Sequence, residues 1–141
     1  MSRLALQNGD DYPEAARKHL LDASALLSSH RPDGAAYLSG YAVECALKTL
    51  IVLEGATPPR HHRLGDLRGE VNRLAAIAGS KAARYIGHAT QTVAAAAIAG
   101  WNPNMRYRPA SVTPGDAATW HAEATRIFRE TIQQMRLDGV I

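Results

Sequence analysis

The stretch AAYLSGYAVECALKTLIV, from Ala35 to Val52, decides how this chain folds. Its apolar residues recur at helical spacing and are dense enough for a helix that is buried around much of its circumference. One stripe of that helix is different, because it carries Tyr37, Tyr41, Glu44 and Lys48 at spacings of three and four residues. The stretch therefore predicts a core helix with a single polar stripe.

The charges on this stripe need an explanation, since a core helix has little use for them. Glu44 and Lys48 are four residues apart and can neutralise each other, and the hydroxyls of Tyr37 and Tyr41 can donate to the carboxylate. One interpretation is a surface ion pair, which contributes about a few tenths of a kcal/mol. We prefer a semi-buried network, either structural or lining an interface or pocket, because buried charges are costly without a specific partner.

The flanking sequence predicts more helices and no strand. Asp11-Tyr12-Pro13-Glu14 reads as a helix start with Asp11 as its N-cap, and Arg31-Pro32-Asp33-Gly34 ends that helix, with Asp33 able to cap the next one. We expect an all-α, up-and-down antiparallel bundle of four to five helices, formed by residues 11–141 as one domain after an N-terminal tail of residues 1–10. The expected helices cover about 11–30, 33–54, 64–78, 81–99 and 115–137. In the last one the expected buried positions are Ala118, Ala122, Ile127, Ile132 and Met135.

Composition excludes several classes of protein. Only one cysteine, Cys45, is present among 141 residues, so no intrachain disulfide can form and a reducing cytoplasm is the expected compartment. We identify no signal peptide and expect no membrane span. No glycine-rich phosphate loop is present, and His61, His62 and Asp66 lack the further ligands that a zinc site needs. We therefore expect neither a metal nor a cofactor.

Basic residues gather in two connecting segments of a chain whose net charge is +3. Four arginines, with His61 and His62, lie between positions 60 and 73, and Arg106-Tyr107-Arg108 lies between two prolines. A solvated surface is one interpretation, and a phosphate-facing patch is the other. Arg106 could bind phosphate while Tyr107 stacks on a base, or Arg106 could instead pair with Glu44 and fasten its segment to the bundle.

The opening stretch, preceded by ARKHLLDASALL and followed by HHRLGDL, resembles the HEPN domain superfamily. The later segment WNPNMRYRP resembles the one before the last helix of small single-domain members, so the resemblance runs from about Asp11 to Met135. It implies an all-α bundle that pairs as a homodimer and belongs to a toxin–antitoxin or phage-defence system. Implied partners are a nucleotide or RNA, and a cognate nucleotidyltransferase or antitoxin protein.

HEPN ribonucleases resemble one another in an R-x(4–6)-H motif, which this chain lacks. Arg84 and His88 have only three residues between them and are weak catalytic candidates; His61 or His62 could instead meet Arg106 in the fold. We therefore expect a module that binds a nucleotide, RNA or a protein partner, with a metal-independent ribonuclease as the alternative. The expected ligand-binding residues are Tyr37, Tyr41, Glu44, Lys48, His61, His62, Arg106 and Tyr107. For the homodimer, the tyrosine stripe and the small residues Ala94 to Ala97 offer surfaces for close helix packing.

Overall fold

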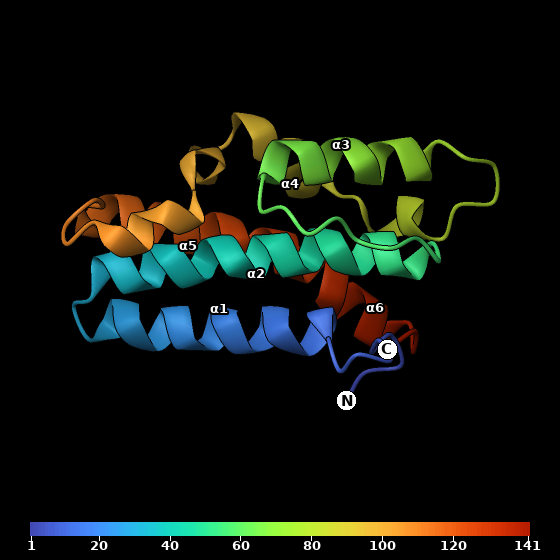
Figure 1. The fold of residues 1–141 in the computed structure, drawn as a ribbon, viewed down its shortest axis with the longest axis horizontal. Helices are drawn as coiled ribbons and strands as arrows, with labels where there is room; N and C mark the ends of the chain where they lie inside the picture. Colours follow the sequence, from blue (N-terminus) through green and yellow to red (C-terminus); the bar gives the residue numbers. More distant parts are fainter.

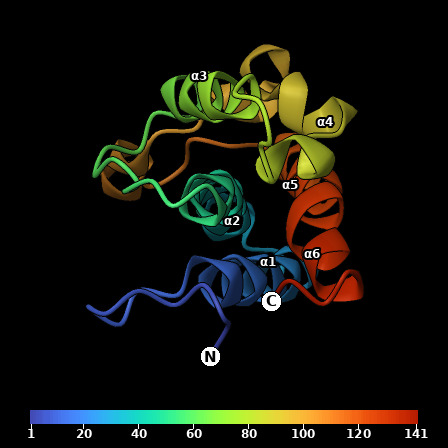
Figure 2. The ribbon, with the colours of Figure 1, turned by 90° about the vertical axis from the view of Figure 1, so that its right-hand side faces the viewer.

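The computed structural model describes all 141 residues and consists of helices and turns, without a β-strand. Helices α1 (Tyr12–Ser28), α2 (Pro32–Leu53) and α5 (Pro114–Phe128) form the body, and α3 (Leu64–Ala75) packs on α2. Figure 1 shows α1 and α2 running antiparallel, with α3 on the opposite side of α2 from α1. Viewed along its axis, α2 lies in the middle of the other helices (Figure 2). The predicted all-α bundle is confirmed.

The first helix begins where the sequence predicts. Asp11 is the N-cap of α1, and its carboxylate accepts the backbone N–H of Glu14 at 3.2 Å. The backbone N–H and the hydroxyl of Ser2 donate to the same carboxylate at 2.6 and 2.7 Å. Asp11 therefore both caps α1 and holds the N-terminal residues against its start.

We had expected Asp33 to cap α2, but it does not. The N-cap position is Arg31, and Pro32 occupies the first turn, where its missing N–H leaves one donor fewer to satisfy. The Asp33 carboxylate instead accepts the backbone N–H groups of Ser111 and Val112 at 2.8 and 2.9 Å. It thereby fastens the segment that leads into α5 to the start of α2.

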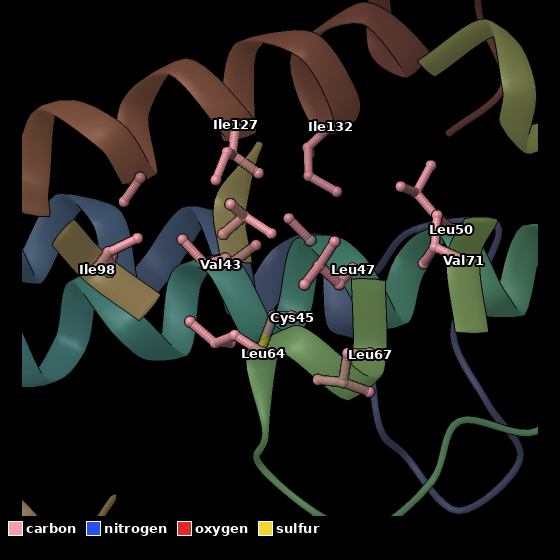
Figure 3. Close-up of a cluster of buried hydrophobic side chains, with 14 of the residues drawn as sticks. Val43, Cys45, Leu47, Leu50, Leu64, Leu67, Val71, Ile98, Ile127 and Ile132 are labelled. Atoms are coloured by element: carbon pink, nitrogen blue, oxygen red, sulfur yellow. The ribbon is translucent and has the colours of Figure 1, made fainter. Parts of the chain in front are cut away.

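Helix α2 is the core helix, with 14 of its 22 residues buried. By length and composition alone it could cross a membrane, although we had expected no such segment. Its most apolar window is 78% buried inside the bundle, which is the pattern of a core helix. Figure 3 shows the contacts that bury it, and each fully buried Leu or Ile side chain contributes about 1.5–3 kcal/mol. The labelled side chains are Val43, Cys45, Leu47 and Leu50 of α2, Leu64, Leu67 and Val71 of α3, Ile98, and Ile127 and Ile132 from the C-terminal helix.

The helix predicted over residues 81–99 is wrong. Only a single α-helical turn forms there, between short 3₁₀ turns, and α3 ends at Ala75 rather than Ala78. The elements that replace the predicted helix and the segment after it are η1 (Ala82–Tyr85), α4 (His88–Gln91), η2 (Val93–Ala95), η3 (Ala97–Gly100) and η4 (Pro103–Tyr107). Ala94 to Ala97 therefore do not form the helical face that we had expected to pack between subunits.

Three glutamates from outside residues 81–100 explain this irregular path, because their carboxylates accept backbone N–H groups at the start of η1, α4 and η3. The pairs are Glu54 with Ala82, Glu130 with Ala89 and Thr90, and Glu123 with Ala97 and Ile98. Hydrogen bonds to a charged acceptor contribute about 1.5–3 kcal/mol each. Helix propensities differ by only tenths of a kcal/mol between most residues, so this capping outweighs the alanine-rich sequence.

The C-terminal helix has the predicted extent, but it is not uniform. α5 passes through a π-helical turn, Arg129–Gln133, labelled η5, into α6 (Gln134–Leu137). Three of the predicted core positions are confirmed, whereas Ala118 is exposed and Ala122 is half-buried. The buried residues of this region are Ala117, Ala124, Ile127, Thr131, Ile132 and Met135.

Candidate functional site

The polar stripe of α2 is inside the protein. Glu44 and Lys48 are each only 4% exposed, and Lys48 Nζ lies 2.7 Å from Glu44 Oε1. The surface-pair interpretation is therefore wrong, and the preferred semi-buried network is confirmed for these two charges. Each charge is largely removed from water, so its stability depends on the partners that the fold provides.

The second carboxylate oxygen of Glu44 is bound by a histidine. Nδ1 of His62 lies 2.9 Å from Glu44 Oε2, and the His62 side chain is 46% exposed. Glu44 therefore holds one edge of the imidazole, and the ring reaches the surface. The alternative in which Arg106 pairs with Glu44 is wrong, since the two carboxylate oxygens are bound by Lys48 and His62.

We had expected the tyrosines of the stripe to donate hydrogen bonds to Glu44, but they do not. The hydroxyls of Tyr37 and Tyr41 lie 3.4 Å from each other instead. The Tyr41 ring is surrounded by the rings of Trp101, His19 and His62, with centroids 4.9, 5.5 and 6.0 Å away. Burial, followed by the hydrogen bond with Tyr37, raises the pKa of Tyr41 to about 12, so this phenol stays protonated and neutral near pH 7.

Trp101 joins the segment that contains Arg106 to the polar stripe. Its indole N–H donates to the backbone carbonyl of Tyr37 at 2.9 Å, and its ring lies against Gly40. A Cβ atom at Gly40 would be 2.1 Å from the indole, so only glycine leaves room for it. The sequence of the segment WNPNMRYRP does not by itself predict a role for Trp101. Its place beside Gly40 depends on a contact across 61 positions of the chain, which no local pattern reveals.

A surface pocket of about 290 Å³ lies beside these residues. It brings together His61, His62 and Arg106, which come from two distant segments of the chain. No carboxylate lines it, and the neighbouring Arg63 is paired with Asp66 at 2.6 Å. We call it the His–Arg pocket, and its lining residues are His61, His62, Arg63, Trp101, Asn102, Pro103, Asn104 and Arg106.

Arg106 forms no salt bridge within the protein; Arg63 does. The guanidinium of Arg106 lies 4.9 Å from the centroid of the Tyr107 ring, and Tyr107 is 74% exposed. The phenols of Tyr107 and then Tyr37 raise the pKa of Arg106 above its ordinary value. The guanidinium is therefore a permanent positive charge at the pocket, next to an exposed aromatic ring.

The weak catalytic candidates, Arg84 and His88, have different surroundings. Arg84 is bound by the carboxylate of Asp138, with contacts of 2.6 and 3.1 Å. His88 lines a separate pocket that also contains Glu123 and Arg126. No group of three or more His, Cys, Asp or Glu side chains is arranged to hold a metal ion. Of these two pockets, only the His–Arg pocket combines histidines with an arginine and has no carboxylate in its lining.

Comparison with known families identifies the chain. The model of the HEPN domain matches residues 10–134, which is nearly the whole sequence. No curated protein and no solved structure matches the chain. The chain belongs to the HEPN domain family.

Proposed function

We propose that this HEPN-domain chain binds a phosphate-bearing ligand, a nucleotide or a single strand of RNA, in the His–Arg pocket. The observation that carries the proposal is the unpaired guanidinium of Arg106 in a pocket that contains His61 and His62 and no carboxylate. Arginine binds phosphate oxygens through a planar, bidentate donor set. The exposed ring of Tyr107 beside Arg106 offers a base a surface to stack on.

The size and shape of the pocket agree with a small part of a longer ligand. Its volume of about 290 Å³ is at the lower end of the range for small-molecule sites. His61, Arg106 and Tyr107 are all at the surface or close to it, so a strand could continue past the pocket. His62 remains fixed, because its Nδ1 edge is bound to Glu44.

The test is a titration with a fluorescently labelled oligouridylate and with a nucleoside monophosphate at two salt concentrations. We expect binding that weakens steeply with salt, and Arg106→Met should reduce the salt slope by about 0.7 for one lost phosphate contact. Arg108→Met is the matched control, because Arg108 is an exposed arginine of the same segment outside this pocket. Absence of binding at low salt, or equal effects of the two variants, would overturn the proposal.

A second candidate function is metal-independent cleavage of RNA at the same pocket. The observation that favours it is the contact between His62 and Glu44, because a carboxylate on one nitrogen of an imidazole orients the other nitrogen for proton transfer. His62 would take the proton of a ribose 2′-hydroxyl as that oxygen attacks phosphorus. His61 would give a proton to the departing 5′-oxygen, and Arg106 would stabilise the charge on the phosphate oxygens.

The products of this reaction are a 2′,3′-cyclic phosphate and a 5′-hydroxyl, which mass spectrometry of a short oligonucleotide would detect. We expect His62→Asn and His61→Ala to abolish cleavage and His88→Ala to leave it unchanged. Equal cleavage by the wild type and all three variants would indicate a contaminating nuclease and would remove this candidate.

The biological setting that fits a HEPN domain is a toxin–antitoxin or defence system in the cytoplasm. The family is often linked to ribonuclease toxins or defence. We propose that the chain forms a homodimer and works with a cognate nucleotidyltransferase or antitoxin protein. Light scattering at micromolar concentrations tests the first part, and a clean monomer mass across that range would contradict it. Co-purification of the neighbouring gene product tests the second part.

A further inference from the structure

A second pocket, of about 480 Å³, lies between the N-terminal segment and the connection from α2 to α3. Figure 2 shows both segments extending to the same side of α2. Lys48 of α2 forms part of its wall, Asp10 and Tyr12 contribute from the N-terminal side, and Thr57 and Arg60 contribute from the connection. None of these residues lines the His–Arg pocket. We call this the Lys48 pocket.

Lys48 is a buried cation with donors to spare. Its side chain is 5% exposed, and its ammonium donates to one protein acceptor, Glu44 Oε1. The Tyr12 ring is close by, with its centroid 5.8 Å from Nζ. An ammonium has three N–H donors, and leaving buried donors unmatched is costly. Because Lys48 lines the pocket, an acceptor placed there would satisfy donors that the protein leaves free.

The outer part of the pocket offers a second cation and one carboxylate. Arg60 is exposed and forms no ion pair with any carboxylate of the chain. Asp10 accepts a hydrogen bond from the side chain of Asn8 at 3.0 Å and has no cationic partner. An ionised carboxylate only accepts hydrogen bonds, so it favours a ligand with a donor at the corresponding end.

We propose that the Lys48 pocket binds a small phosphorylated molecule that also carries hydroxyl groups. The phosphate lies between Lys48 and Arg60, whose donors match its three terminal oxygens, and a hydroxyl of the ligand donates to Asp10. The volume is within the range of about 300–1,000 Å³ that small-molecule sites occupy. This site is distinct from the one proposed above, because the two share no lining residue.

Ribose 5-phosphate is a suitable probe, with inorganic phosphate and ribose as the two parts of it. We expect calorimetry to show that ribose 5-phosphate binds more tightly than inorganic phosphate and that ribose does not bind. Amide shifts in NMR spectra should then change at Asn8, Tyr12 and Thr57 rather than at Asn102 and Asn104. Lack of binding by both phosphates, or shifts confined to Asn102 and Asn104, would overturn the proposal.

Variants separate the contributions without disturbing the core. Arg60→Met changes an exposed side chain and should weaken ribose 5-phosphate by about tenfold or more. Asp10→Asn should weaken ribose 5-phosphate but not inorganic phosphate, and Arg106→Met should affect neither. Unchanged affinity in Arg60→Met, or a loss in Arg106→Met, would contradict the Lys48 pocket as the site. Equal affinity of the two phosphates, unaffected by Asp10→Asn, would refute the hydroxyl contact.

Discussion

Replacing Glu44 by leucine should destabilise the protein far more than an ion-pair substitution on the surface does. The variant leaves the ammonium of Lys48, which is 5% exposed, without its carboxylate at 2.7 Å. Breaking a buried pair from one side costs about 3–5 kcal/mol, because the remaining charge is uncompensated. Lys48→Met should cost less than Glu44→Leu, since Glu44 then still has His62 at 2.9 Å.

Urea unfolding followed by circular dichroism measures this effect. With a slope of about 2 kcal/mol per molar urea, the expected shift of the midpoint for Glu44→Leu is about 1.5–2.5 M. The double variant Glu44→Leu/Lys48→Met should recover most of the loss, because it removes both buried charges. Glu70→Leu is the control: it breaks a pair with Arg73 that is also 2.7 Å long, but whose side chains are 33% and 62% exposed. That control should change stability by less than about 1 kcal/mol.

Two results would refute this reasoning. If Glu44→Leu and Glu70→Leu shift the midpoint equally, burial does not control the strength of the pair. If the effects of Glu44→Leu and Lys48→Met simply add in the double variant, the two side chains are not coupled in solution.

Three further substitutions test other parts of the structure. Gly40→Ala places a Cβ 2.1 Å from the indole of Trp101, so the melting temperature of the protein should fall by about 2–8 °C. Gly69→Ala is the control: Gly69 has open space around it, so this substitution should leave the melting temperature unchanged or raise it. The hydrogen bonds that Arg84 donates to Asp138, with smaller contributions from nearby side chains, lower the pKa of Asp138 to about 2. The stabilisation from this carboxylate is therefore present above its ordinary pKa of 3.8 and is lost as the pH falls through about 2. The difference in melting temperature between the wild type and Asp138→Asn should therefore be positive at pH 6 and shrink between pH 4 and pH 2; a constant difference would contradict this. Glu130→Ala should speed amide hydrogen exchange at Thr90, whose N–H and hydroxyl the carboxylate accepts, while exchange in α1 and α2 stays unchanged.

The sequence was sufficient where a signal is local. Helical periodicity and the capping residue Asp11 located the first helix, and the spacing of Glu44 and Lys48 indicated a buried pair. The second partner of Glu44 was not predicted: Arg106 was one alternative, but His62, 18 positions further along the chain and beyond the end of α2, binds the carboxylate instead. The helix predicted over residues 81–99 was wrong for a related reason. Their alanines favour a helix, but carboxylates of other elements decide their path.

The three glutamates that cap the turns of residues 81–100 also have a consequence for how this region can change over evolution. The side chains that determine the path of residues 81–100 lie mostly outside this region, at Glu54, Glu123 and Glu130. Exposed positions within it, such as Ala94 and Ala95, contribute little packing. Surface segments of this kind accept new residues and insertions readily. Insertions at Ala94–Ala95 should therefore be tolerated as long as the three carboxylates remain.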